Sequence, residues 1–223
     1  MAGVLSVVAT PIGNLGDFSP RARAVLQAAA AVVCEDTRVT RKLLAGSGIS
    51  VPTVSCHHHS SPSVVAGLVA RLMRGENLAL VTDAGTPGVS DPGGVLVAAA
   101  AAAGISVVAV PGPSAVAAAL SVAGFPANRF LFLGYPPHKK GRATFFREAA
   151  ACPYTVVLYE STHRILKTLA ELGSAAPSRA LVVCRELTKL HETLYRGTAA
   201  AIMVRLSETS SKGEFVVIVD PAR

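Results

Sequence analysis

Short β-branched runs alternate with longer segments of helical period through the first half of this chain, and this alternation constrains the fold most strongly. Two strands that are joined by a helical crossover lie parallel in one sheet, and the helix packs against one face of that sheet. We therefore predict a doubly wound α/β lobe with a mainly parallel sheet. Its strands are expected at 4–9, 31–34, 52–55, 78–81 and 106–110, and its helices at 19–30, 37–45, 63–74 and 94–103.

The pattern changes beyond segment 134–142, and we infer a second, smaller α/β lobe with a mixed sheet that starts near residue 113. Segment 134–142, GYPPHKKGR, is rich in proline, glycine and basic residues, so we interpret it as a loop or hinge. The two lobes are placed at 1–112 and 113–223. The second lobe is expected to have helices at 114–123, 161–172 and 198–206, strands at 130–133, 154–159, 180–184 and 215–219, and a hairpin around 191–195.

Composition narrows the class of protein. The chain is 51% hydrophobic, yet no apolar run approaches the roughly 18 residues of a membrane span, so we expect no membrane association. Its four cysteines are far apart and form no C-x-x-C pair, which favours reduced thiols in a cytoplasmic protein. The net charge of +7 attracts phosphate-rich partners such as nucleic acid, although a basic excess can also serve solubility alone.

The turns that follow the predicted strands are the places to look for a ligand, because open α/β sheets bind ligands at the carboxyl ends of their strands. The turn 10–17, TPIGNLGD, is not the G-x-G-x-x-G of dinucleotide-binding proteins. The turn 34–38, CEDTR, brings together Glu35, Asp36 and Arg38, whose carboxylates could orient a polar ligand or take a proton. The alternative is an ordinary helix start capped by Asp36 or Thr37.

Four further segments are polar enough to bind a ligand. Segment 82–94 contains four glycines and can wrap a ligand with backbone groups. Segment 111–115, PGPSA, ends in a serine that opens a helix, and it either holds an anion or is a simple turn. Segments 159–164, YESTHR, and 185–192, RELTKLHE, are either a polar substrate surface or solvated loops.

Other chemistries are disfavoured by the motifs. Adjacent residues of an extended chain point to opposite sides, so the triplet His57-His58-His59 is a poor metal site and we predict no metal. The chain has no G-x-S-x-G nucleophile elbow and no phosphate-binding G-x-x-x-x-G-K-[ST] loop.

Taken in order, TPIGNLGD, EDTR, DAGTPGVSDPG, PGPSA, FLGYPP, YESTHR, RELTKLHE and KGEFVV resemble the branch of the tetrapyrrole methylase family that modifies ribosomal RNA. The resemblance extends from Val4 to Val219. It implies two α/β lobes with S-adenosylmethionine in the cleft between them. The implied reaction is 2′-O-methylation of a decoding-centre cytidine in the 16S rRNA of the small ribosomal subunit. The implied assembly is a homodimer. The rivals are a methyltransferase of the same fold acting on a porphyrinoid, and a non-catalytic RNA-binding protein of ribosome assembly.

The resemblance also implies roles for individual residues. Glu35 and Asp36 would lie closest to the ribose hydroxyl as catalytic carboxylates. RNA phosphates would be held by Arg38, Lys139, Lys140, Arg142, Arg185 and Lys189. Many relatives continue into a helical tail that this sequence lacks after Asp220, so we expect any RNA contact of that tail to be missing. The cofactor would be held, mostly through backbone atoms, by Pro11, Asp83, Ala84, Gly85, Thr86, Val89, Ser90, Ser114, Ala115, Leu133, Gly134, and Glu160 or Ser161.

Overall fold

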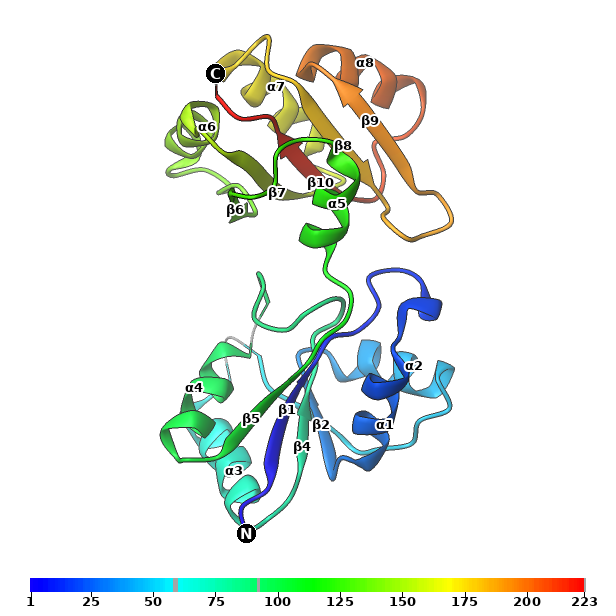
Figure 1. Ribbon diagram of the computed structural model, residues 1–223, viewed down its shortest axis with the longest axis vertical. Coiled ribbons are helices and arrows are strands. Elements are labelled where there is room, and N and C mark those ends of the chain that lie inside the picture. The colour runs from blue at the N-terminus through cyan, green and yellow to red at the C-terminus, as the bar shows by residue number, and fades with distance from the viewer. Residues whose placement is uncertain (58–59, 92, 223) are drawn as a thin grey trace. The chain divides into compact units, whose positions relative to one another are not determined.

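Five parallel strands form the sheet of the first half of the chain, as the alternating pattern predicted. The computed structural model describes residues 1–57, 60–91 and 93–222. The chain divides into two units, residues 1–114 and 115–223, called here the first and second unit. The sheet of the first unit has the order β3-β2-β4-β1-β5 (Figure 1). Its strands are β1 (Val4–Val8), β2 (Ala31–Cys34), β3 (Thr53–Ser55), β4 (Leu78–Leu80) and β5 (Ser106–Val110).

Helices cover both faces of this sheet, which makes the first unit doubly wound (Figure 1). One apolar cluster joins the sheet to α1 and α2 through Leu26 and Leu44, and the other joins it to α3 and α4 through Leu72 and Leu96. Burying both faces of a strand selects the continuous apolar runs seen in the sequence. The helices are α1 (Pro20–Ala28), α2 (Thr37–Gly46), α3 (Pro62–Met73) and α4 (Gly94–Ala102), with a short helix η1 (Leu15–Asp17) before α1.

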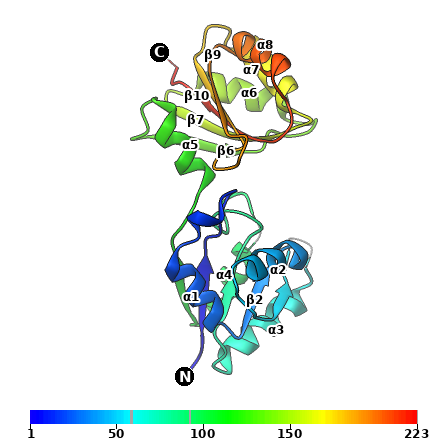
Figure 2. The same cartoon turned by 90° about the vertical axis from the view of Figure 1, so that its right-hand side faces the viewer.

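The second unit contains a mixed five-stranded sheet of order β6-β7-β10-β8-β9, which confirms the predicted fold class. Only β6 and β7 are parallel; the other neighbours are antiparallel. Figure 2 shows α6, α7 and α8 above this sheet and α5 below it. The strands are β6 (Phe130–Gly134), β7 (Thr155–Ser161), β8 (Leu181–Arg185), β9 (Thr193–Gly197) and β10 (Glu214–Val219), and the helices are α5 (Ala115–Ala123), α6 (Arg142–Ala151), α7 (Ile165–Ala175) and α8 (Ala199–Glu208).

The structure differs most from the sequence prediction at α6 and at the end of β7. Helix α6 was not expected, and Arg142 is its first residue instead of the end of a loop. Strand β7 continues through Ser161, because Glu160 and Ser161 pair with β10, and α7 therefore begins only at Ile165. Along the residues that the structure describes, no helix is long and apolar enough to cross a membrane.

Candidate active site

The loops that follow β1 and β4 meet at the carboxyl edge of the parallel sheet. The chain leaves β1 toward β2 and leaves β4 toward β5, on opposite sides of this adjacent pair, which is the topology at which open α/β sheets bind ligands. The place where these two loops meet is called here the crevice. Thr10 and Gly85 exchange two backbone hydrogen bonds of 2.9 and 3.1 Å across it. This pairing brings Pro11 beside the Gly85 loop.

The same loop is tied to the segment that ends the first unit. The Thr86 hydroxyl donates to the Pro113 carbonyl at 3.0 Å, which brings the neighbouring Ser114 toward the crevice. Gly85 has a φ of +80°, and a Cβ there would lie 3.3 Å from the Ile12 side chain, so this position requires glycine. The Thr82 hydroxyl at the base of the loop is buried and has no hydrogen-bond partner within the described residues. A close backbone approach and an unsatisfied buried hydroxyl fit a polar ligand at this place.

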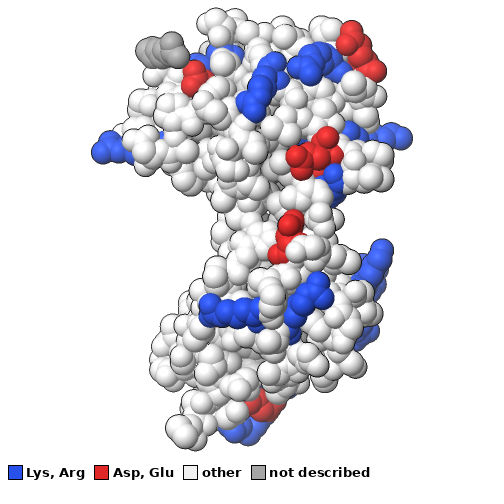
Figure 3. Space-filling view, turned by 45° about the vertical axis from the view of Figure 1, so that its right-hand side comes forward, with Lys and Arg blue, Asp and Glu red and all other residues white. Residues whose placement is uncertain are grey.

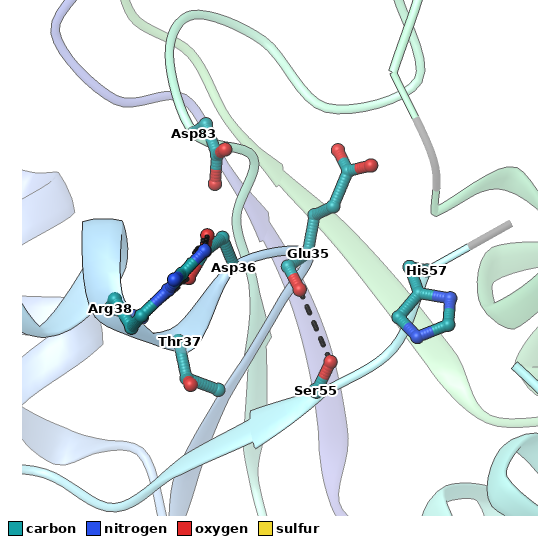
Figure 4. A pocket seen from close by; sticks show the side chains of 7 residues that line it. All are labelled: Glu35, Asp36, Thr37, Arg38, Ser55, His57 and Asp83. Atoms are coloured by element: carbon teal, nitrogen blue, oxygen red, sulfur yellow. Dashed lines mark hydrogen bonds and ion pairs between the residues drawn. The ribbon is translucent and has the colours of Figure 1, made fainter.

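A pocket of about 550 Å³ lies beside this crevice, at the ends of β2, β3 and β4. The β2–β3 register pairs Cys34 with Ser55, so the residues after these two strands emerge side by side. Figure 4 shows that the Asp83 carboxylate points toward Asp36 and Arg38, whereas the Glu35 side chain extends away from that pair. The pocket is lined by Glu35, Asp36, Thr37, Arg38, Ser55, His57 and Asp83.

Asp36 is largely committed to the local fold. Its carboxylate caps α2 by accepting from the Arg38 backbone N–H at 2.8 Å, and it pairs with the Arg38 guanidinium at 2.7 Å. These hydrogen bonds lower the pKa of the Asp36 carboxyl to about 2. An acceptor with so low a pKa binds a proton weakly, so the capping alternative describes Asp36 better than the predicted role as a base.

Asp83 has the opposite electrostatic environment. Partial burial raises the pKa of its carboxyl, and the nearby Asp36 carboxylate adds to this shift, while the Asp36 backbone N–H opposes it. Glu35 is half-buried, and its carboxylate makes no hydrogen bond within the described residues. Its backbone carbonyl accepts from the Ser55 hydroxyl at 3.1 Å, which fixes the start of the turn. The pocket thus has two carboxylates able to accept a proton, Glu35 and Asp83.

Sequence reasoning assigned no pocket role to Ser55, His57 or Thr37. Ser55 follows the short strand β3, and its place in the pocket depends on the pairing of β3 with β2. His57 was considered only as part of a metal triplet, whose other members, His58 and His59, lie outside the described residues. Among the residues that are described, no three His, Cys, Asp or Glu side chains are grouped to hold a metal ion.

In the second unit, the residues predicted to contact the cofactor lie at two neighbouring strand ends and at a helix start. Gly134 ends β6 with a φ of +64° and pairs with Leu158 of β7, two residues before Glu160. Ala115 begins α5. The Glu160 side chain is fully buried and accepts from the Thr168 hydroxyl and the Ser161 backbone N–H, so its carboxylate is committed to the protein.

Arg142 does not fit the predicted contact with RNA, because its side chain is only 7% exposed. Its guanidinium pairs with Glu171 at 2.6 Å and donates to the Thr168 hydroxyl and the Pro137 carbonyl. Thr168 in turn donates to Glu160, which pairs with Arg164 at 3.4 Å. This chain of contacts, called here the buried network, anchors the 135–141 loop and leaves its Lys139 and Lys140 exposed.

Arg185 and Lys189 hold the 185–192 loop together. The Arg185 guanidinium donates to the carbonyls of Lys212 and His191, which leaves its charge unpaired by these contacts. The Lys189 ammonium lies between Glu186 at 3.0 Å and Glu214 at 2.8 Å. Two carboxylates therefore balance the charge of Lys189, which makes it a weaker candidate for binding phosphate than Arg185.

Comparisons with known proteins agree with this architecture. The sequence model of Tetrapyrrole (Corrin/Porphyrin) Methylases matches residues 4–203. The chain is 50% identical to "Ribosomal RNA small subunit methyltransferase I" of Xylella fastidiosa strain Temecula1, over 99% of this chain and 82% of that protein. It is 44% identical to the protein of the same name from Synechocystis sp., over 97% of this chain and 78% of that protein. Its fold is similar to that of the methyltransferase CobJ, with a TM-score of 0.71, 20% identity, and coverage of 99% of this chain and 95% of that one.

Proposed function

Because this chain belongs to the tetrapyrrole methylase family, we propose that it is an S-adenosylmethionine-dependent methyltransferase of small-subunit ribosomal RNA. The observation that carries the substrate assignment is 44–50% identity, over nearly the whole chain, to proteins named for that RNA. The proposed reaction is 2′-O-methylation of a decoding-centre cytidine in 16S rRNA. The basic charge supports an RNA substrate, since residues 115–223 contain fourteen Lys and Arg against eight Asp and Glu.

The cofactor site is proposed at the crevice between β1 and β4. S-adenosylmethionine supplies, when bound, a methyl group already activated on sulfonium sulfur. In the first unit, Pro11, Gly85, Thr86 and Ser114 would hold it, with Thr82 offering its buried hydroxyl. The other predicted contacts from this loop are Asp83, Ala84, Val89 and Ser90, and those from the second unit are Ala115, Leu133, Gly134, and Glu160 or Ser161.

The pocket next to the crevice is proposed to receive the target ribose. A 2′-hydroxyl is a weak nucleophile at neutral pH, so a carboxylate that accepts its proton speeds transfer. Glu35 and Asp83 are the acceptors available, and partial burial raises the pKa of Asp83, which favours binding of the proton. Asp36 would act as a positioning residue that fixes Arg38 and the first turn of α2. Arg38, Arg185, Lys139 and Lys140 would contact neighbouring phosphates.

A porphyrinoid substrate is the second candidate, since the family includes methylases of corrins and porphyrins. A macrocycle needs a broad apolar wall, whereas this pocket is lined by three carboxylates, an arginine, a histidine and two hydroxyls. The lining therefore favours a ribose and its phosphates.

A cytoplasmic homodimer is part of the same proposal. All four cysteines are buried and unpaired, which suits a reducing compartment. Sedimentation equilibrium at micromolar concentrations tests the assembly, and a monomer throughout would remove the dimer from the proposal.

The direct test offers three acceptors in parallel to the full chain with radiolabelled S-adenosylmethionine. These are small ribosomal subunits lacking the modification, free small-subunit RNA and a porphyrinogen. Label recovered in a ribose of the subunit RNA is the expected result. Label in the porphyrinogen alone would replace the proposed substrate, and cofactor binding without transfer to any acceptor would point to a non-catalytic RNA-binding role.

A further inference from the structure

The first unit has little net charge, but its basic side chains are unevenly placed. Residues 1–114 contain seven Lys and Arg against six Asp and Glu. Arg71 and Arg74 both pair with Glu76 beyond the end of α3. The other five basic residues lie on α1 and α2, the helices that share one face of the sheet. Figure 3 turns this side of the unit toward the viewer and shows several Lys and Arg side chains on it.

Helix α2 carries three of these cations in one stripe that starts at the pocket. Arg38, Arg41 and Lys42 are spaced i, i+3 and i+4, so they lie on the same side of the helix, one turn of about 5 Å apart. The buried residues of α2, Thr40 and Leu44, hold it against the sheet. Arg38 lines the pocket with a side chain that is 88% exposed, and Arg41 and Lys42 are exposed beyond it.

The two outer cations have no acidic partner within the described part of the chain. The Arg41 guanidinium donates to the neutral Thr53 hydroxyl at 2.9 Å, which orients it without neutralising it. After its Asp36 cap, α2 contains no acidic residue, so no helical ion pair forms with Lys42. The last turn of α2, where cations would stabilise the helix dipole, contains no basic residue. Helix stability therefore does not account for where these charges lie.

We infer that Arg38, Arg41 and Lys42 form a phosphate-binding strip, along which the RNA strand runs as it leaves the pocket next to the target nucleotide. The inference rests on the proposed RNA substrate. Arg38 meets the phosphate nearest the pocket, and Arg41 and Lys42 meet the following ones. A flexible single strand suits such a strip, because its phosphates can adapt to cations carried on one rigid helix.

The test measures binding of a single-stranded RNA with the decoding-region sequence to the full chain at several salt concentrations. Each phosphate contact on a single strand contributes roughly 0.7 to the slope of log affinity against log salt. The double variant Arg41→Gln/Lys42→Gln should therefore flatten the slope by roughly 1.4 and weaken binding roughly fivefold or more at 0.15 M salt.

The matched control is Arg147→Gln/Lys167→Gln on α6 and α7. It removes the same amount of charge as the α2 double variant. Like that variant, it replaces one arginine that is bonded to a threonine hydroxyl and one exposed lysine. Its salt slope should stay at the wild-type value. Equal flattening in both variants would overturn the strip in favour of a general charge effect, and an unchanged slope in the α2 variant would overturn it outright.

Binding of S-adenosylmethionine checks that the variants are folded. If the α2 double variant loses that binding, Lys42→Glu alone decides, since this exposed side chain has no hydrogen bond or ion pair to a described residue. Lys42→Glu should flatten the slope by at least roughly 0.7. RNA binding without methyl transfer by the wild type would reject the proposed function and leave the strip testable. Methyl transfer by the wild type, together with an unchanged salt slope in Lys42→Glu, would reject the strip and leave the proposed function standing.

Discussion

Charged side chains in the two units of this protein are used differently. In the second unit, Arg142 and Glu160 are buried and both bond to the Thr168 hydroxyl. Arg142 also pairs with Glu171, and Glu160 also pairs with Arg164. In the first unit, Glu35 and Asp83 face a pocket, and neither carboxylate forms an ion pair with a residue that the structure describes. Both sets come from motifs that looked equally functional in the sequence.

The difference shows that bonding, more than residue type, separates structural from reactive charges. A buried charge must be paired, so the buried network holds its loop and costs stability if broken. A carboxylate that the fold leaves open to a pocket keeps its lone pairs for a substrate. The predictions below test this contrast from the largest expected effect to the smallest.

The largest effect is expected from Arg142→Met, which removes the cation of the buried network but keeps a side chain against Phe146. It leaves Glu171 without its ion-pair partner and removes a donor to the Thr168 hydroxyl, so the free energy of unfolding should fall by about 3 kcal/mol. All four tyrosines lie in the second unit and the chain has no tryptophan, so tyrosine fluorescence in urea reports on this unit. Arg147→Met, exposed on the same helix, should change stability by less than about 0.5 kcal/mol. Equal effects of the two would contradict the structural role.

Asp83→Asn should slow methyl transfer by about 100-fold, because it removes the proposed proton acceptor while preserving shape. The raised pKa of Asp83 means that its ionised form is lost as the pH falls through that pKa, so the wild-type rate should fall on the acid side. This fall of the rate at acid pH should be absent in the variant. Single-turnover rates at saturating cofactor across pH measure the loss of rate and its pH dependence. The same fall at acid pH in the variant would exclude Asp83 as the acceptor.

Glu35→Gln should lower the same rate at least about tenfold, since it removes the second open carboxylate of the pocket. Glu76→Gln is the matched control, because Glu76 belongs to the same unit but pairs with Arg71 and Arg74 away from the pocket. The control should transfer methyl groups at the wild-type rate. A loss smaller than tenfold in Glu35→Gln would count against its role.

The smallest effect is expected from Asp36→Asn, which keeps a capping side chain but loses the ion pair with Arg38. A carboxyl whose folded pKa is lowered adds stability above its unfolded pKa of about 4, and this contribution disappears as the pH falls toward 2. Thermal unfolding between pH 5 and 2 should therefore depend less on pH in the variant. The same pH dependence in both proteins would show that the ion pair adds nothing.

The sequence was sufficient to predict strands in which every residue is buried and apolar. Strand β2 has the predicted bounds, since four consecutive buried apolar residues leave little freedom. Helix α6 was missed, because it follows a proline- and glycine-rich loop and begins with a buried arginine. That burial depends on Glu171, which lies 29 residues further along the chain, on another helix.

The pocket was predicted in part. The turn after β2 pointed to Glu35 and Asp36, but the approach of Asp83 depends on β4 pairing with β2, a long-range contact that no local pattern specifies. For the same reason Asp83 was assigned to the cofactor loop alone. The competition between capping and catalysis at Asp36 was visible in the sequence and could be decided only from its hydrogen bonds.

The central claim is that the pocket of the first unit carries the chemistry, and the double variant Glu35→Gln/Asp83→Asn tests it most directly. Its S-adenosylmethionine affinity and its rate of methyl transfer to unmodified small ribosomal subunits would be measured in the same preparation. Because Asp83 would contact the cofactor through its backbone, which Asp83→Asn keeps, the account predicts cofactor binding within a few-fold of wild type. It predicts a rate at least as low as that of Asp83→Asn, about 100-fold down. Transfer within tenfold of wild type, with the cofactor bound, would contradict it.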